Sequence, residues 1–161
     1  SGGGVELIDF VDLAQKEMLM ILGWRNHENI KKWMYVQDEI SVDAHFGFID
    51  ELQFSKSRQY MAVKKDNKYV GVVDFTKIDG TNKECYFGLY ANPFEKIAGI
   101  GWVLEEVCLK YILDLLILNK IKLEVFSDNV RALNLYKKYN FKRVGMKSVN
   151  DKQVICMELV R

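Results

Sequence analysis

A glycine-rich turn, placed between a strand-like segment and the longest apolar segment of the chain, most limits what this sequence can fold into. Residues 84–90 alternate as a strand, Pro93 ends it, and Gly99 and Gly101 precede an apolar segment that extends to Leu118. Two glycines at a helix start expose backbone N–H groups without Cβ obstruction, and the helix dipole adds partial positive charge. We therefore expect this turn to bind an anion such as a pyrophosphate, and the helix to pack across a sheet.

The turn matches neither of the two common phosphate-binding fingerprints. A Walker loop needs G-x-x-x-x-G-K-S/T, and a dinucleotide-binding loop would need a third glycine where Leu104 stands. Taken alone, the turn is also compatible with a purely structural role. In the helix that follows, the spacing predicts one narrow solvent-facing stripe, made of Glu105, Glu106, Lys110 and Asp114.

The remaining segments predict one mixed domain. The 161 residues are the length of a single domain, expected over 5–161, and Ser1–Gly4 is interpreted as an expression-tag remnant because it lacks an initiator Met. Further strands are expected at 5–10, 60–62, 69–75, 121–126, 141–148 and 154–160, and further helices at 13–22 (ending near Gly23), 42–54 and 129–139. Runs of strands followed by a strand-helix-strand unit predict an α/β or α+β fold with helices on both faces of a mixed sheet.

Charge and cysteine content exclude several classes of protein. With 23 basic and 22 acidic side chains, the net charge of +1 argues against nucleic acid or an anionic membrane as partner. The apolar stretch 111–118 is far shorter than the roughly 20 residues that cross a bilayer. Three separated cysteines without a C-x-x-C pair encode neither a disulfide framework nor a metal site, so a reduced, cytoplasmic protein without metal is expected; they are Cys85, Cys108 and Cys156.

A second motif follows the 121–126 strand and reads Asn129-x-x-Ala132-x-x-Leu135-Tyr136-x-x-x-Asn140-Phe141. Together with Lys96-x-x-Gly99-x-Gly101, it resembles the two signature motifs of the GNAT superfamily of acetyl-CoA-dependent N-acetyltransferases. The resemblance implies a mostly antiparallel seven-stranded sheet that is splayed at its middle. Two departures are modest. Lys96 stands where Arg or Gln is commoner, and Asn140 replaces a glycine, although Asn also tolerates positive φ.

The resemblance implies how acetyl-CoA would be held. The pyrophosphate would lie on Lys96, Ile97, Ala98, Gly99, Ile100 and Gly101, and the pantetheine between Leu89, Tyr90 and Ala91 on one side and Asn129, Ala132 and Tyr136 on the other. Tyr136 would be the general acid, because a phenol of pKa roughly 10 can protonate a thiolate whose thiol has a pKa of about 8.5. Structural roles stay open: Asn129 as a helix N-cap, Tyr136 as a core aromatic and Lys96 as a solvated charge.

The acceptor half resembles a narrower group, the bacterial N-acetyltransferases of pseudaminic acid biosynthesis. The resemblance rests on Trp24-Arg25-Asn26-His27, Trp33-Met34 and Ile40-Ser41-x-x-x-His45. It implies transfer to the 4-amine of a UDP-4-amino-4,6-dideoxy sugar, contacted by Arg25, His45, Thr76, Lys77 and Tyr90, with Arg25 and Lys77 suited to its diphosphate. Ribosomal-protein N-terminal acetyltransferases share a related W-R-N segment. A protein N-terminus, another small amine or a non-catalytic CoA-binding module therefore remain alternatives.

Two carboxylates are candidates to take the proton of the attacking amine, Glu124 and Asp74. By analogy with the family Glu124 is the better placed, and Asp74 could instead bind the ammonium form. No cysteine matches a family nucleophile, which favours direct transfer in a ternary complex. The aromatic segment 33–35 could bury the substrate or a neighbouring subunit, so a homodimer is left open. A basic cluster could meet the adenosine phosphates of the coenzyme or be a solvated face; it comprises Lys137, Lys138, Lys142 and Arg143.

Overall fold

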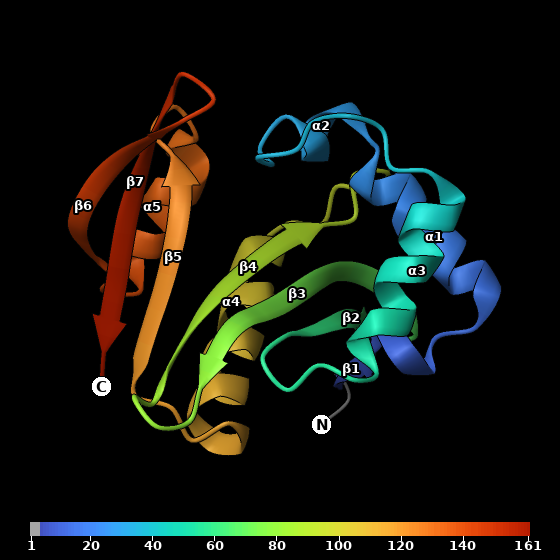
Figure 1. The fold of residues 1–161 in the computed structure, drawn as a ribbon, viewed down its shortest axis with the longest axis horizontal. Helices are drawn as coiled ribbons and strands as arrows, with labels where there is room; N and C mark the ends of the chain where they lie inside the picture. The colour runs from blue at the N-terminus through green and yellow to red at the C-terminus, as the bar shows by residue number, and fades with distance from the viewer. Residues whose placement is uncertain (1–3) are drawn as a thin grey trace.

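In the computed structural model, which describes residues 4–161, seven strands form one mixed sheet in the order β1-β2-β3-β4-β5-β7-β6 (Figure 1). The strands are β1 (Val5–Asp9), β2 (Gln59–Lys65), β3 (Lys68–Asp79), β4 (Glu84–Ala91), β5 (Lys120–Phe126), β6 (Lys142–Val149) and β7 (Lys152–Val160). Only the central β4–β5 pair is parallel. Apart from Gly4, the expected tag remnant lies outside the described residues.

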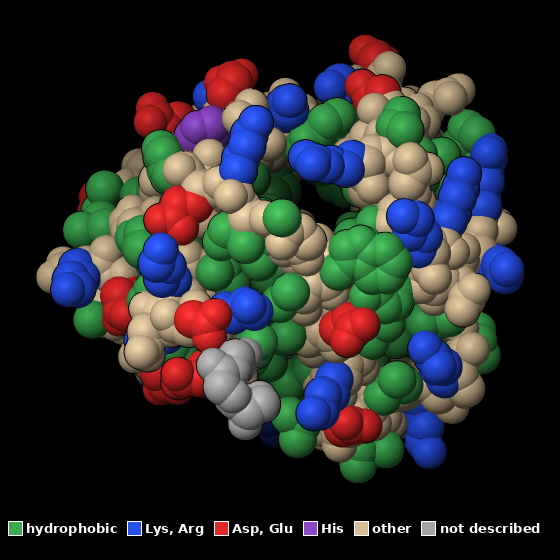
Figure 2. Space-filling model, turned by 180° about the vertical axis from the view of Figure 1, so that it is seen from behind, with side chains coloured by type: hydrophobic (Ala, Val, Ile, Leu, Met, Phe, Trp, Pro, Cys, Tyr) green, Lys and Arg blue, Asp and Glu red, His purple; other side chains and the backbone are tan. Residues whose placement is uncertain are grey.

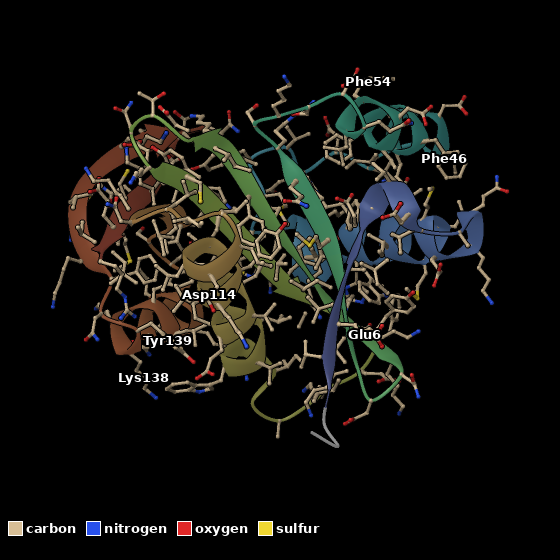
Figure 3. All side chains as sticks on the ribbon, turned by 90° about the horizontal axis from the view of Figure 1, so that it is seen from below. Glu6, Phe46, Phe54, Asp114, Lys138 and Tyr139 are labelled. Carbon is tan, nitrogen blue, oxygen red and sulfur yellow. The ribbon has the colours of Figure 1, made fainter. Side chains whose placement is uncertain are left out.

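Helices cover both faces of this sheet, as the order of elements predicted (Figures 1 and 3). One face carries α1 (Gln15–Arg25) and α3 (Val42–Leu52), and the other carries α4 (Ile100–Lys110) and α5 (Val130–Lys138). Short helical pieces complete the chain: α2 (Glu28–Lys31), a 3₁₀ turn (Phe10–Asp12) and a π-helical turn (Tyr111–Leu115). No helix of the described residues has the length and apolarity needed to cross a membrane.

Strand β3 illustrates how the sheet separates two hydrophobic cores. Because successive side chains of a strand point to opposite faces, Val73 and Phe75 pack under α4 and α5, whereas Val72 packs under α1 and α3. All three are fully buried. Asp74 lies between Val73 and Phe75 in sequence, so its carboxyl group points to the α1 and α3 face of the sheet.

One end of a predicted helix shifts slightly, and one predicted helix face is wrong. Helix α1, expected to end near Gly23, continues to Arg25, because a helical glycine costs only about 1 kcal/mol and the buried side chain of Trp24 favours continuation. The polar stripe expected on α4 does not include Glu105, whose side chain is 0% exposed. Glu105 shares the inward face of α4 with Leu104 and Cys108, whereas the neighbouring Glu106 is exposed.

Candidate active site

The parallel strands β4 and β5 separate halfway along their length, and the separation creates the principal cavity. Their pairing runs from Glu84 with Lys120 to Tyr86 with Lys122 and then stops, after which the strands diverge (Figure 1). The cavity between them measures about 990 Å³. Seen from the α4 side, the surface has a dark hollow with basic side chains at its rim and hydrophobic side chains around it (Figure 2). The β5-facing edge of residues 89–91 is left to pair with a bound ligand.

The glycine turn places an uncapped helix N-terminus at the cavity wall. Gly99 is the N-cap residue of α4 and adopts φ 74°, a left-handed conformation that costs glycine little. Because glycine has no side chain, none caps the first turn of α4. The Ile100 N–H donates to the Ile97 carbonyl at 3.2 Å, and the N–H groups of Gly101 and Trp102 remain available to an anion. Lys96 also lines the cavity and adds a full positive charge beside the helix dipole.

Tyr136 lies on the opposite wall, held by aromatic packing. Its ring contacts Phe87 edge-on with the centroids 5.9 Å apart, and it contacts Phe141 at the same centroid distance. Burial raises the pKa of the Tyr136 phenol, and the nearby Glu105 raises it further. The phenol therefore remains protonated at neutral pH and can act as a proton donor.

Local features at both ends of α5 orient Tyr136. At the start, the Asn129 Oδ1 atom accepts a hydrogen bond from the Ala132 N–H at 3.3 Å, so Asn129 is an N-cap as well as a cavity residue. At the end, Asn140 adopts φ 70°, which confirms that Asn serves in place of glycine there. This turn brings the Phe141 N–H within 3.1 Å of the Tyr136 carbonyl and returns the chain under the tyrosine ring.

Asp74 lies on the cavity wall, opposite Gly88 in the β3–β4 register. A Cβ atom at Gly88 would come within 2.9 Å of the Asp74 Oδ2 atom, so the glycine makes room for the carboxyl group. Burial raises the pKa of Asp74 to about 7. No side chain or N–H group of residues 4–161 donates a hydrogen bond to this carboxyl group, which leaves it free to exchange a proton with a bound amine.

Glu124, the second predicted carboxylate, also lines the cavity but is already engaged. Its Oε1 atom accepts a hydrogen bond from the Tyr35 hydroxyl at 2.5 Å, and its Oε2 atom forms a salt bridge with the Lys147 Nζ atom at 2.8 Å. Burial opposes ionisation of Glu124, but the hydrogen bonds from Lys147 and Tyr35 outweigh it and lower the pKa below the usual range. Glu124 is therefore a stable anion that accepts protons poorly.

The structure brings most of the predicted site residues to this one cavity. Every residue expected to contact the coenzyme lines it, as do both candidate carboxylates: Asp74, Leu89, Tyr90, Ala91, Lys96, Ile97, Ala98, Gly99, Ile100, Gly101, Glu124, Asn129, Ala132 and Tyr136. Of the residues expected to contact the acceptor, only Tyr90 lines the cavity. Arg25, His45, Thr76 and Lys77 do not.

Local contacts explain where two of these acceptor residues lie. His45 is buried between α3 and α1, where its Nε2 atom donates to the Met18 carbonyl at 2.8 Å, and burial lowers its pKa. Such a histidine is neutral and serves helix packing. Arg25 donates from Nη2 to the Val36 carbonyl at 3.0 Å, while its buried Nη1 has no hydrogen-bond partner among residues 4–161. Burial raises the pKa of the neighbouring Tyr90, and the guanidinium charge of Arg25 partly offsets this rise.

Some further cavity residues had alternative roles in the sequence analysis, and others were not predicted from the sequence. Trp33 and Met34 line the cavity, which is one of the two roles left open for the aromatic segment, and the homodimer stays a prediction. Arg131 and Asn134 of α5 also line it, together with Lys138, the one member of the basic cluster that does. Their i, i+3 and i+7 spacing is a helix-face pattern, which would have identified them once α5 was known to border the site.

An open strand edge that leads to an uncapped helix N-terminus, with a tyrosine opposite, is the arrangement expected of an acyltransferase that takes its acyl group from coenzyme A. The sequence agrees, because residues 22–141 match the acetyltransferase (GNAT) family, and the chain belongs to that family. It is an N-acetyltransferase whose cosubstrate is acetyl-CoA.

Several known acetyltransferases are similar to this chain in sequence or in structure. The acetyltransferase PseH from two strains of Campylobacter jejuni is 36% identical over 137 residues, which cover 85% of this chain and 84% of that protein. The crystal structure of C. jejuni N-acetyltransferase PseH with acetyl coenzyme A superposes with a TM-score of 0.79 at 30% identity, covering 98% of this chain and 99% of that one. Spermidine N-acetyltransferase from Vibrio cholerae has a TM-score of 0.87 at 19% identity over 99% and 95% of the chains, which shows a shared fold.

Proposed function

We propose that this enzyme acetylates the 4-amine of a UDP-4-amino-4,6-dideoxy sugar of the pseudaminic acid pathway. The observation that carries the proposal is the 36% identity to C. jejuni acetyltransferase PseH over most of both chains. The acceptor side of the cavity adds support. Asp74 and Tyr90 line it, and the cationic Arg25 lies beside Tyr90, where a ligand that carries both a ring and phosphates would meet complementary groups.

In the proposed reaction both substrates are bound at once. The acetyl-CoA thioester would lie beside the open edge of residues 89–91, whose backbone N–H groups stabilise the oxyanion. The amine nitrogen attacks the thioester carbonyl carbon and forms a C–N bond, and its proton passes to the Asp74 carboxylate. The C–S bond then breaks, and Tyr136 protonates the departing sulfur.

We assign the role of general base to Asp74 rather than to Glu124 because the pKa values of the two carboxyl groups differ. A general base is most effective when its pKa lies near the working pH, and burial sets the pKa of Asp74 at about 7. Glu124 is held ionised by Tyr35 and Lys147. In this proposal Glu124 organises the acceptor side of the cavity and takes no proton.

The protonation state of the buried cysteines supports direct transfer of the acetyl group from acetyl-CoA to the amine. Burial raises the pKa of Cys85 to about 12 and that of Cys108 well above the ordinary thiol value. Because a thiolate, and not a thiol, is the effective nucleophile, neither residue is suited to carry the acetyl group. Neither of them lines the cavity.

The test is thiol release from acetyl-CoA in the presence of different acceptors. We expect release with the UDP-4-amino-4,6-dideoxy sugar and only background with no acceptor, with spermidine or with a peptide that has a free N-terminus. UDP should compete with the sugar and not with acetyl-CoA. Release driven by the peptide or by spermidine, and not by the sugar, would overturn the acceptor assignment while leaving the acetyltransferase activity in place.

A further inference from the structure

Glu105 carries a buried carboxyl group that the proposed reaction does not use. It is 0% exposed, and both of its carboxyl oxygens lack a hydrogen-bond partner among residues 4–161. No lysine or arginine of the described chain forms a salt bridge with it. Burying a carboxyl group without a partner costs stability, and native proteins seldom do so without a reason. Glu105 is therefore a candidate for a role in catalysis.

Contacts between α4 and α5 place Glu105 at the junction of these two helices (Figure 3). Gly101, one helical turn before Glu105, approaches α5 so closely that a Cβ atom there would lie 3.5 Å from the Leu135 Cδ2 atom. Four positions after Leu135, the Tyr139 hydroxyl donates at 3.2 Å to the side chain of the residue that follows Glu105. Glu105 thus lies on the part of α4 that packs against α5.

Tyr136, the proposed proton donor, belongs to the same junction. It follows Leu135 on α5, and its ring is buried in the same hydrophobic core as Leu104, which precedes Glu105. Burial raises the pKa of the Tyr136 phenol most, and a charge on Glu105 raises it further. The two side chains are therefore close enough for the ionisation of Glu105 to change the acidity of Tyr136.

The titratable groups around Glu105 are all acids. They are Tyr136 and Tyr139 from α5, Glu106 and Cys108 from α4, Cys85 from β4 and Asp74 from β3. Burial, without a cation to oppose it, raises the pKa of Glu105 to about 8. Glu105 is therefore a neutral carboxylic acid at pH 7 and becomes an anion as the pH rises above about 8.

We propose that Glu105 is a positioning residue that acts through Tyr136 in the acetyl transfer. As a neutral acid, Glu105 leaves the Tyr136 hydroxyl able to protonate the departing sulfur, whereas as an anion it makes that hydroxyl a weaker donor. In the step itself the Tyr136 O–H bond breaks and the S–H bond of coenzyme A forms, and Glu105 gives and takes no proton. The proposal rests on the general-acid role of Tyr136 proposed above.

The pH dependence of kcat distinguishes this role from a purely structural one. Acetyl-CoA and the amine identified by the acceptor test are kept at saturation, and circular dichroism verifies that each variant is folded at each pH. We expect the ratio of kcat for Glu105→Gln to kcat for the wild type to be near one at pH 6.5. The ratio should rise roughly three- to tenfold by pH 9.5, because only the wild type acquires the charge. Glu105→Met should show the same rise, and it serves as the test if the buried amide of Glu105→Gln prevents folding.

Two further variants make the result specific to Tyr136. Glu106→Gln changes the exposed neighbouring carboxylate and should keep the pH dependence of the wild type. In a Tyr136→Phe background, Glu105→Gln should leave kcat unchanged at both pH values, since the hydroxyl on which Glu105 acts is absent.

A ratio that stays constant from pH 6.5 to 9.5, or a rise that persists in the Tyr136→Phe background, would overturn the proposal. If Tyr136 were not the general acid, Tyr136→Phe alone would retain full turnover. That result differs from a constant ratio in an enzyme that Tyr136→Phe inactivates, so the failure of each proposal can be recognised.

Discussion

The Tyr35 hydroxyl donates a hydrogen bond to the Glu124 Oε1 atom at 2.5 Å and joins two residues that lie 89 positions apart in the chain. The Tyr35 ring also packs edge-on against Phe126 with the centroids 5.6 Å apart, and the Asn150 Nδ2 atom donates to the Tyr35 carbonyl at 3.1 Å. These contacts fasten the segment between α2 and α3 to β5 and to the β6–β7 turn. Trp33 of this segment lines the cavity together with Glu124 and Phe126 of β5.

Removing the hydrogen bond between Tyr35 and Glu124 should weaken acceptor binding and leave acetyl-CoA binding unchanged. Tyr35→Phe keeps the ring on Phe126 and loses the bond to Glu124, so we expect the KM for the acceptor to rise about tenfold. The KM for acetyl-CoA should not change. Steady-state kinetics with each substrate varied in turn measures both. Tyr111→Phe is the matched control, since the Tyr111 hydroxyl bonds to Gln59 outside the cavity. Equal changes in both KM values would contradict the expectation.

Tyr136→Phe should abolish most turnover while acetyl-CoA still binds. The variant keeps the ring packed against Phe87 and Phe141 and removes only the proton donor, and general acid catalysis contributes typically 10²- to 10⁴-fold. We expect kcat to fall within that range and the acetyl-CoA dissociation constant to stay within about twofold, since the ring that borders the coenzyme is kept and only its hydroxyl is lost. Turnover close to that of the wild type would mean that solvent protonates the thiolate.

The pH dependence of catalysis should report Asp74. The base must be ionised, so kcat/KM should rise as the pH increases through about 7, the raised pKa of this buried carboxyl group. Asp74→Asn should lower the rate and remove that rise. Glu124→Gln should keep its midpoint, because Glu124 is already ionised well below this range. If the midpoint near pH 7 survives in Asp74→Asn, another group takes the proton.

Because of Glu105, the stability of the protein should decrease as the pH rises. Burial raises its pKa from 4.5 to about 8, so the native state retains a proton that the unfolded state loses first. The free energy of unfolding should therefore fall as the pH rises from about 4.5 to 8, and the loss should be complete above pH 8.

Glu105→Met removes this cost without removing volume. The variant should be more stable than the wild type at pH 8 by a few kcal/mol, on the order expected for a shift of this size, with a smaller difference at pH 5. Urea unfolding at pH 5, 7 and 9 measures the difference. Glu106→Gln, one position away and exposed, should not alter the slope. A constant difference between Glu105→Met and the wild type across these pH values would show that Glu105 is not protonated in the native state.

The coenzyme half of the site could be predicted from the sequence because its geometry is local. The residues from Lys96 to Gly101 occupy one turn into one helix, and Asn129 and Tyr136 lie on the next helical segment. Backbone preferences over a few residues determine such units, as the left-handed Gly99 and Asn140 illustrate. The order of the strands and helices followed from hydrophobic periodicity for the same reason.

Tertiary structure alone decided the state of the ionisable groups. Glu105 looked solvent-facing from helical spacing, yet it is buried, because which side of α4 faces the sheet depends on how the distant strands pack against it. Glu124 and Asp74 were both candidate bases in the sequence, and the family resemblance favoured Glu124. Of these two residues, Glu124 is the one that contacts Tyr35 and Lys147. Asp74 is the one whose carboxyl group is buried without a hydrogen-bond partner among residues 4–161. A pKa depends on charges and solvent within a few ångströms, and residues distant in the sequence supply them.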